Sequence, residues 1–415
     1  MNRLFTLLIV VAMVAGIAVG AWCNQHFHDP DQIKEIVGWF KVVTDVFLRL
    51  IKMIIAPLVF STLVAGIAHM GDAGSVGRVG AKTMFWFISA SIVSLLLGLG
   101  MVHLLQPGVG LTLPVPDATA ATVDTAKFTL QEFITHVFPK SIFEAMANNE
   151  ILQIVVFSIF IGVAVASLDD KAPGILVLVE QIAAIMLKVT GYVMRLAPLA
   201  IFAALAGTVT QYGVDILTIY AKVIGGFYLS LGVLWATLAL AGLLFVGPRI
   251  FTLLTSVWQP TLLAFGTASS EAAYPRTLEA LQKFGVSRKV ASFVLPLGYS
   301  FNLDGSMMYC TFATLFIAQI YGIEMTVSQQ ITMLLLLMVT SKGMAGVPRA
   351  SLVVIAATLT YFKLPEAGLA LILAVDQVLD MGRSATNVVG NSVAAAVVAK
   401  WEGQLGPSEK DAAAA

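Results

Sequence analysis

Long apolar runs, separated by polar or Gly/Pro-rich connections, make up the first half of the chain. The first run, from Leu4 to Trp22, carries no charge and is about as long as a bilayer-spanning helix needs to be. It lacks a small-residue cleavage site followed by a polar start, so we predict a retained helix and not a signal peptide. Comparable runs cover roughly 42–69, 82–105, 130–167, 174–209 and 217–247. The pattern therefore predicts six transmembrane helices within residues 1–247.

The apolar stretches of the second half are interrupted by three polar segments. These are GTASSEAAYP at 266–275, SFNLDGS at 300–306 and SKGMAGVPRAS at 341–351. Irregular backbone at membrane depth is tolerated only where protein buries it or water reaches it, as in the broken helices of secondary transporters. We therefore predict re-entrant helical hairpins at about 250–285 and 328–362, and a seventh and an eighth helix at about 288–322 and 366–401.

Composition makes this an integral membrane protein. The chain is 58% hydrophobic and 12% charged, whereas soluble domains carry about 25% charged residues. With 24 basic and 24 acidic residues the net charge is zero, which gives no reason to expect a nucleic-acid partner. The expected surroundings are membrane lipid. Both cysteines lie in apolar runs, so no disulfide framework is expected.

The distribution of basic residues predicts the orientation of the chain. An excess of Lys and Arg marks cytoplasmic loops. With the N-terminus in the cytoplasm, alternating spans and two hairpins place most basic residues on that side, namely Arg78, Lys82, Lys171, Arg249, Arg276, Lys283, Arg288 and Lys289. The opposite side receives mainly Lys34 and Lys127. Both termini, including a tail at 403–415, are thus predicted to be cytoplasmic.

A polar stripe runs along the last apolar helix. Its members are separated by 4, 3, 4 and 4 residues, and they are Asp376, Asp380, Arg383, Asn387 and Asn391. On a helix these positions fall within about 80° of one another. One alternative is a structural Asp–Arg pair at the membrane interface, but five polar groups on one face favour function. A guanidinium can hold a carboxylate with two hydrogen bonds, and the preceding aspartate can bind an ammonium group. With Ser384 beside them, these groups suit a zwitterionic acid.

The segment SFNLDGS places Asn302, Asp304 and Ser306 around a glycine. Unwound backbone frees carbonyl oxygens, and carbonyls with a carboxylate can form a cation site. The alternative is a kinked helix in which Asp304 caps a half-helix.

The two hairpin tips carry further candidates. Free backbone amides at such tips can bind a carboxylate, although ordinary loops are the alternative. Glu271 follows Ser269 and Ser270 on the first tip. Burial disfavours the charged form of a carboxyl group, so Glu271 can carry a proton near neutral pH. Arg349 on the second tip is its candidate salt-bridge partner. A simple capping role for Glu271 is the alternative.

Taken together, these motifs resemble the glutamate transporter family, the dicarboxylate/amino acid:cation symporters. SFNLDGS resembles the family's Asn-Met-Asp-Gly-Thr motif, TASSEAAYP its serine-rich first hairpin, SKGMAGVP its second hairpin and DMGRSATNVVGN its last helix. The resemblance implies a homotrimer. Helices 1, 2, 4 and 5 would form a trimerisation scaffold. Helices 3 and 6, the hairpins and residues 248–402 would form a transport domain that moves as an elevator.

The resemblance also assigns substrate contacts. Asp380 matches the ligand of the substrate amino group, and Arg383 matches the ligand of the side-chain carboxylate. Further contacts match Ser270, Ser306, Val347, Pro348, Ser384 and Asn387. Dicarboxylate carriers of the family lack an acidic residue at position 380, so Asp380 favours glutamate or aspartate as substrate.

Departures from the family pattern concern the driving ion. Sodium-coupled members have an aspartate at the position of Asn391, and a tyrosine and a threonine at those of Phe87 and Ala90. Fewer oxygen ligands weaken hard-cation binding. The residual cation-site candidates are Ser91, Asn302, Asp304, Asn387 and Asn391. The proton site of animal members falls on Cys310, so protonation must occur elsewhere. Glu271 is the first candidate, with Arg349 as its partner, and Asp304 is the second.

These features predict a proton-driven glutamate/aspartate symporter of a bacterial inner membrane, with a co-transported proton and no cofactor. Alternatives within the family are a sodium-coupled carrier and a C4-dicarboxylate carrier. An anion channel is the alternative of another class, because polar stripes also line pores. No enzyme is expected, since the five histidines stand beside no candidate nucleophile motif and no metal-ligand cluster is evident.

Overall fold

The apolar runs of the first half form long helices. In the computed structural model they are α1 (Arg3–His26), α2 (Pro30–Ala68), α3 (Ala73–Leu105) and α10 (Ala221–Val246). The structure describes residues 3–68, 73–109, 135, 137–168, 173–213, 220–341, 350–365, 368–373 and 375–407. Within these residues the regular structure is helical, and the only β contact is an isolated bridge between Val286 and Leu405. Among the described residues, four helices are long and apolar enough to cross a membrane, namely α1, α3, α10 and the helix Pro173–Val193. The prediction of an all-α membrane protein is confirmed at this level.

Two of the predicted spans differ in the structure. The end of the run at 130–167 holds the short helix α5 (Ile142–Ala147) and then α6 (Ile151–Ser167), because the polar sequence Asn148–Asn149–Glu150 separates them. The run at 174–209, which we count as one span, forms α7 (Pro173–Val193) and α8 (Ala197–Tyr212). A 3₁₀ turn, η2 (Met194–Leu196), joins these two helices, and a proline follows in the first turn of α8. Proline lacks an N–H donor and is accommodated best in the first turn of a helix.

The second half consists of shorter helices that end at the polar segments. Helices α11 (Arg249–Ser256) and α12 (Trp258–Thr267) lead to a turn at Ala268, whose φ of 49° ends α12. The chain returns through η3 (Glu271–Ala273) and α13 (Tyr274–Phe284), so this stretch is a helical hairpin. The remaining helices are α14 (Arg288–Phe301), α15 (Asp304–Ile320), α16 (Val327–Thr340), α17 (Ala350–Tyr361), α18 (Leu369–Leu373) and α19 (Asp376–Trp401).

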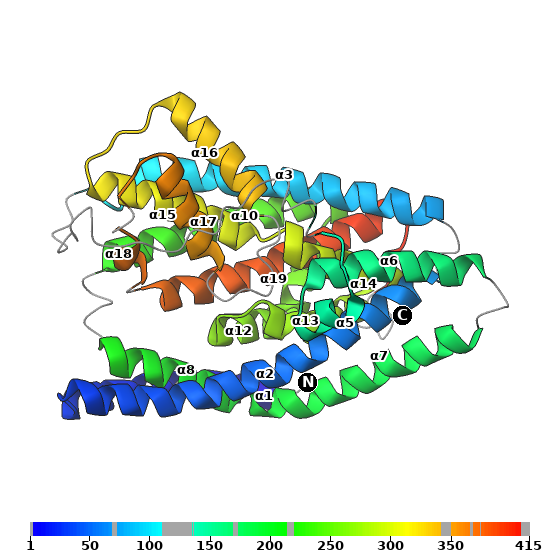
Figure 1. Cartoon of the computed structure of the whole chain (residues 1–415), viewed down its shortest axis with the longest axis horizontal. Coiled ribbons are helices and arrows are strands. Elements are labelled where there is room, and N and C mark those ends of the chain that lie inside the picture. Colours follow the sequence, from blue (N-terminus) through cyan, green and yellow to red (C-terminus); the bar gives the residue numbers. More distant parts are fainter. Residues whose placement is uncertain are drawn as a thin grey trace.

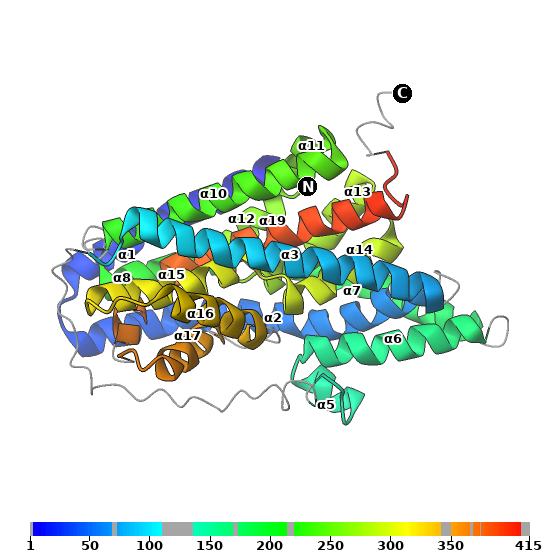
Figure 2. The same ribbon diagram turned by 90° about the horizontal axis from the view of Figure 1, so that it is seen from above.

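Helix α19 lies in the middle of the molecule, between two groups of helices (Figures 1 and 2). In one group, α1 packs along α8, and α2 packs along α6, α7 and α8. In the other, α3 packs along α15 and α10. Helix α19 contacts α10, α12, α14 and α15. The polar stripe of α19 is therefore placed inside the protein and not against lipid.

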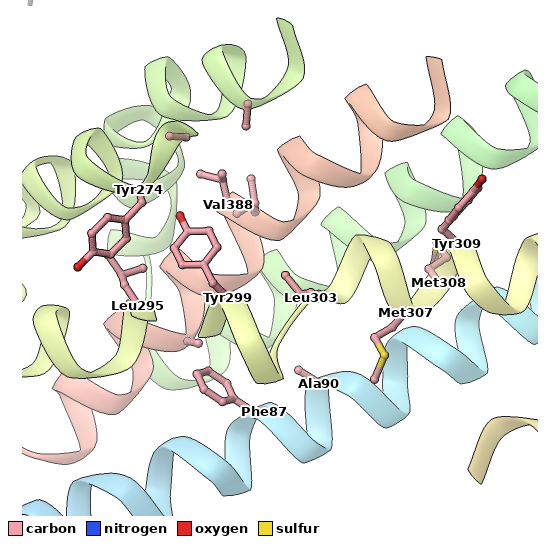
Figure 3. Close-up of a cluster of buried hydrophobic side chains, with 14 of the residues drawn as sticks. Phe87, Ala90, Tyr274, Leu295, Tyr299, Leu303, Met307, Met308, Tyr309 and Val388 are labelled. Carbon is pink, nitrogen blue, oxygen red and sulfur yellow. The ribbon is translucent and has the colours of Figure 1, made fainter. Parts of the chain in front are cut away.

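A buried apolar cluster joins α3, α13, α14, α15 and α19 around this stripe (Figure 3). Phe87 from α3 and Val388 from α19 are fully buried in it, and Ala90 and Leu303 pack nearby. The resemblance described above associates the α3 positions of Phe87 and Ala90 with hydroxyl side chains in sodium-coupled members. Here they contribute packing only, since neither side chain has a polar atom.

Glycines allow α19 to approach its neighbours closely. A Cβ atom built on Gly390 would collide with the carboxylate of Asp304, and one on Gly298 would collide with the Asn391 amide. These two glycines thus bring α14, α15 and α19 within side-chain contact of one another.

Gly390→Ala is expected to destabilise the protein by about 1–3 kcal/mol, because overpacking forces the Asp304 side chain or α19 to move. Thermal unfolding of the purified protein in detergent measures this as a lowered Tm. Gly225→Ala on α10 is the matched control, since nothing lies within 4 Å of the added Cβ. Equal Tm values for the two variants would contradict the close contact.

Ionic contacts tie the C-terminal end of α19 to α3. The Glu402 carboxylate lies 2.6 Å from Lys82 Nζ and 3.1 Å from Arg78 Nε. Burial alone would raise the pKa of Glu402, but the hydrogen bonds and charges of Lys82 and Arg78 outweigh it and hold this pKa below its usual range. The ionised carboxylate therefore stabilises the folded protein above the pKa of an unfolded Glu, and this contribution is lost as the pH falls through the lower folded pKa.

We expect Glu402→Gln to lower the free energy of unfolding at neutral pH by up to about 1 kcal/mol, because Arg78 is exposed and such pairs are screened by solvent. Acidification should then lower the Tm of the variant less than that of the parent protein. Thermal unfolding between neutral pH and the acid range measures this difference, and parallel pH profiles would contradict it.

Candidate functional site

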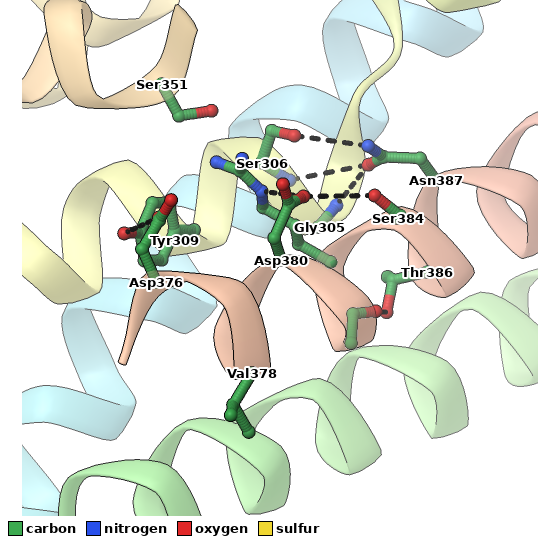
Figure 4. Close-up of polar contacts among 12 residues, drawn as sticks. Gly305, Ser306, Tyr309, Ser351, Asp376, Val378, Asp380, Ser384, Thr386 and Asn387 are labelled. Atoms are coloured by element: carbon green, nitrogen blue, oxygen red, sulfur yellow. Dashed lines mark hydrogen bonds and ion pairs between the residues drawn. The ribbon is translucent and has the colours of Figure 1, made fainter. Parts of the chain in front are cut away.

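The polar stripe of α19 faces the break between α14 and α15. Four of its five members, all except Asp380, are buried. Because α14 ends at Phe301 and α15 begins at Asp304, residues 302 and 303 form a short non-helical link opposite the stripe. The spacing-based prediction of a single face is consistent with this arrangement (Figure 4).

Arg383 and Asp380 form an ion pair at the centre of the stripe. Arg383 Nε donates to Asp380 Oδ1 at 2.6 Å, and Ser384 Oγ donates to the same oxygen at 3.1 Å. Arg383 is only 5% exposed. Its buried Nη1 has no hydrogen-bond partner among the described residues. Since buried donors are nearly always paired in native proteins, this atom marks a place where an anion can bind.

Hydrogen bonds join Asn387 of α19 to Ser306 of α15. The Asn387 amide oxygen accepts from the backbone N–H of Gly305 at 2.9 Å and from that of Ser306 at 3.4 Å. The amide nitrogen donates to Ser306 Oγ at 3.1 Å. Residue Leu303, at the N-cap of α15, makes no side-chain capping bond, so Asn387 supplies this cap from another helix. A ligand at Asn387 would share these bonds or replace them.

A second polar cluster lies one turn further along α19. Asn302 Nδ2 donates to Asp304 Oδ2 at 3.0 Å and to Asn391 Oδ1 at 3.2 Å. Ser94 of α3 donates to Asp304 Oδ1 at 3.1 Å, whereas Ser91 donates to the Phe301 carbonyl at 3.4 Å. Ser91 is among the residues predicted from the sequence, whereas Ser94, almost one turn further along the same helix, is not.

This cluster provides one carboxylate, that of Asp304, which is fully buried. Asn302 Oδ1 and Asn391 Nδ2 have no hydrogen-bond partners within the described part of the chain. Among the described residues there is also no group of three or more His, Cys, Asp or Glu side chains that could hold a metal ion.

Tyr309 and Asp376 join the site without having been assigned a role from the sequence. Tyr309 OH donates to Asp376 Oδ1 at 2.7 Å, and the Tyr309 ring centroid lies 4.8 Å from Arg383 Cζ. Both residues are buried. Asp376 belongs to the stripe, and Tyr309 follows Ser306 by three residues on α15, so helical spacing could have indicated both.

The first hairpin tip is fixed by local hydrogen bonds. Ala272 N donates to Ser269 Oγ at 3.2 Å, and Ala273 N donates to the Ser270 carbonyl at 3.1 Å. Glu271 is half-buried at the start of η3. The second tip, with Val347, Pro348 and Arg349, lies outside the described residues. The expected pair between Glu271 and Arg349 therefore stays a prediction.

Comparison with known proteins identifies the family. The family model described as the sodium:dicarboxylate symporter family matches residues 5–401. A proton/sodium-glutamate symport protein of Bacillus caldotenax is 40% identical over 95% of this chain and 94% of its own length. A proton/glutamate-aspartate symporter of Escherichia coli (strain K12) is 40% identical over 95% of this chain and 92% of its own. A C4-dicarboxylate transport protein of Cupriavidus necator is 38% identical over 98% and 94%. The chain is thus a membrane transporter and not an enzyme, and it belongs to the sodium:dicarboxylate symporter family.

Proposed function

We propose that this protein is a secondary symporter that imports glutamate or aspartate together with protons. The observation that carries the proposal is the buried guanidinium of Arg383, which holds Asp380 at 2.6 Å and leaves Nη1 without a partner among the described residues. A zwitterionic acid offers a carboxylate for Arg383 and an ammonium group for Asp380. Arg383 thus provides a group for the side-chain carboxylate, the charge that distinguishes an acidic amino acid from a neutral one, and Asp380 provides a group for the ammonium.

Further contacts would complete the binding of the substrate. Asn387 and Ser306 can share their mutual hydrogen bond with the α-carboxylate, and Ser384 adds a hydroxyl beside Asp380. Ser270 on the first tip and the backbone at Val347 and Pro348 on the second are proposed to close over the ligand.

Protons are the proposed driving ion because the site is poor in charged oxygen ligands for sodium. Asn391 supplies an amide where, by the resemblance, sodium-coupled members have a carboxylate, and Phe87 and Ala90 supply no side-chain oxygen. Glu271 is the first candidate for carrying the proton and Asp304 the second. A proton that enters with the substrate cancels one negative charge, which lowers the cost of moving the loaded site through the membrane.

The two groups of helices support an elevator mechanism. Helices α1, α2 and α6 to α8 would form the scaffold of a homotrimer, and α3 and α10 to α19 would form the moving transport domain. Helices α12 and α14 contact α8 and α2, so the boundary between scaffold and transport domain would run through these contacts. A bacterial inner membrane with both termini in the cytoplasm is the proposed location.

Uptake by proteoliposomes tests the proposal. Labelled aspartate and glutamate should accumulate under an imposed pH gradient in the absence of sodium, with saturable kinetics. Accumulation only under a sodium gradient would favour a sodium-coupled carrier of the same family. Inhibition by succinate without inhibition by glutamate would favour a C4-dicarboxylate carrier, a function named for the relative from Cupriavidus necator. Flux that neither saturates nor follows any gradient would indicate an anion channel.

A further inference from the structure

Tyr309 connects the substrate-binding helix to its neighbour and has no function in the scheme above. From α15 its hydroxyl reaches Asp376 at the start of α19, where it donates to Oδ1 at 2.7 Å (Figure 4). Its ring passes beneath the guanidinium of Arg383, with 4.8 Å between the ring centroid and Cζ. Tyr309 is fully buried and Asp376 is 2% exposed, so both contacts are made away from solvent.

These contacts restrict how Arg383 can move. An arginine side chain has several rotatable bonds, and a long side chain loses conformational entropy when it is ordered. Asp380 holds the Nε edge of the guanidinium, and the Tyr309 ring supports its face through a cation–π contact. Together they leave Nη1 as the buried donor without a partner among the described residues. The plane and direction of the guanidinium are therefore set before any ligand binds.

Asp376 acts on Arg383 through Tyr309. Without the bond from its hydroxyl to Asp376 Oδ1, the tyrosine ring could swing about its Cα–Cβ bond and leave the guanidinium unsupported. In addition to the carboxylate of Asp380, Asp376 places a second carboxylate near the guanidinium of Arg383. When the substrate ammonium shares Asp380, the charge of Asp376 still compensates Arg383. Other titratable groups near these residues are Cys310 on α15 and Tyr228 on α10, whose hydroxyl donates to the Val378 carbonyl at 2.7 Å.

We propose that Tyr309 and Asp376 are positioning residues. They hold the guanidinium of Arg383 in the orientation in which it binds the side-chain carboxylate of the substrate. They thereby set the selectivity for acidic over neutral amino acids. This inference rests on the proposed function, because it assumes that Arg383 binds the substrate's side chain.

The test compares L-aspartate with L-asparagine, which has the same shape but a neutral side chain. Affinities are measured for the full-length protein in detergent by calorimetry, and by competition where binding is weak. Tyr309→Phe keeps the ring and removes the bond, and Asp376→Asn keeps the shape and removes the charge. Each variant should weaken aspartate binding about tenfold, which corresponds to the loss of one hydrogen bond to a charged group. Each should weaken asparagine binding by less than about twofold. The double variant should lose no more than the larger single effect, because the pair acts as a unit.

Tyr228→Phe is the matched control. It removes a buried tyrosine hydroxyl that also bonds to α19, but this bond ends on the Val378 carbonyl and not on a side chain next to Arg383. The expected result is a comparable change in Tm with an unchanged ratio of aspartate to asparagine affinity. If Asp376→Asn impairs folding, Tyr309→Phe tests the same bond with less disturbance.

Two outcomes would overturn the inference. One is equal weakening of aspartate and asparagine by the Tyr309 and Asp376 variants. The other is the same loss of selectivity in Tyr228→Phe, which would make the pair a structural contact only. Failure of the proposed function is distinguishable, because the parent protein would then bind neither aspartate nor glutamate.

Discussion

Arg383→Ala is expected to weaken the binding of L-aspartate and L-glutamate by at least about thirtyfold. Losing one partner of a buried, hydrogen-bonded charge pair costs about 2–5 kcal/mol, and each 1.4 kcal/mol is about tenfold in affinity. The guanidinium is buried at 5% exposure, so water cannot replace it for the substrate carboxylate. Calorimetry on purified protein at fixed pH, with and without sodium, measures the effect. Thermal unfolding must show that the variant is folded.

Asp380→Ala separates recognition of the two ends of the substrate. Succinate has no ammonium group, so this variant should lose aspartate binding while changing succinate binding far less. Arg383→Ala should weaken both ligands. Because Arg383 and Asp380 compensate each other at 2.6 Å, Arg383→Gln provides a second, more conservative replacement. Unchanged aspartate affinity in a folded Arg383 variant would show that the carboxylate binds elsewhere.

Glu271→Gln is expected to abolish concentrative uptake under a pH gradient while exchange of internal for external substrate continues. A glutamine keeps the shape and the hydrogen-bonding ability of a neutral glutamic acid, so the loaded form can still cross the membrane. It cannot release the proton, so the gradient no longer drives accumulation. Proteoliposomes loaded with unlabelled aspartate measure exchange, and empty proteoliposomes with an imposed pH gradient measure accumulation.

Glu279→Gln on the same hairpin is the control for this experiment. Glu279 pairs with Arg276 at 2.7 Å, and both side chains are partly exposed. Its neutralisation should leave gradient-driven accumulation intact. If Glu271→Gln still accumulates substrate, the proton is carried by another group, and Asp304→Asn becomes the decisive variant.

The local patterns of the sequence predicted much of what surrounds the site. The 4-3-4-4 spacing from Asp376 to Asn391 indicated one face of one helix, and α19 places these residues against α14 and α15. The Gly and polar residues of SFNLDGS indicated a break, and α14 indeed ends at Phe301. Such features depend on residues close in the chain, where helical periodicity and glycine act directly.

Contacts between distant helices were not predictable in the same way. Ser94 donates to Asp304 across 210 positions of the chain, and Asn387 caps α15 from α19. In the sequence, Tyr309 is an aromatic residue within an apolar run, and nothing near it in the chain indicates its contacts with Asp376 and Arg383 on α19. The run at 174–209 breaks at η2, just before the proline at the start of α8, and hydrophobicity alone does not register this break.

The sequence by itself therefore determined that the chain is a helical membrane protein and that the polar residues of its last helix share one stripe. Through the resemblance it also indicated that Asn391 stands where sodium-coupled members have a carboxylate. Periodicity and composition suffice for this because they describe each helix separately. Only the tertiary structure decided which polar groups share hydrogen bonds and that Nη1 of Arg383 stays without a partner among the described residues. It also decided that the Tyr309 ring, bonded to Asp376, lies against the face of the guanidinium. These facts depend on how closely α15 and α19 approach, and that distance is set by packing at Gly305 and Gly390.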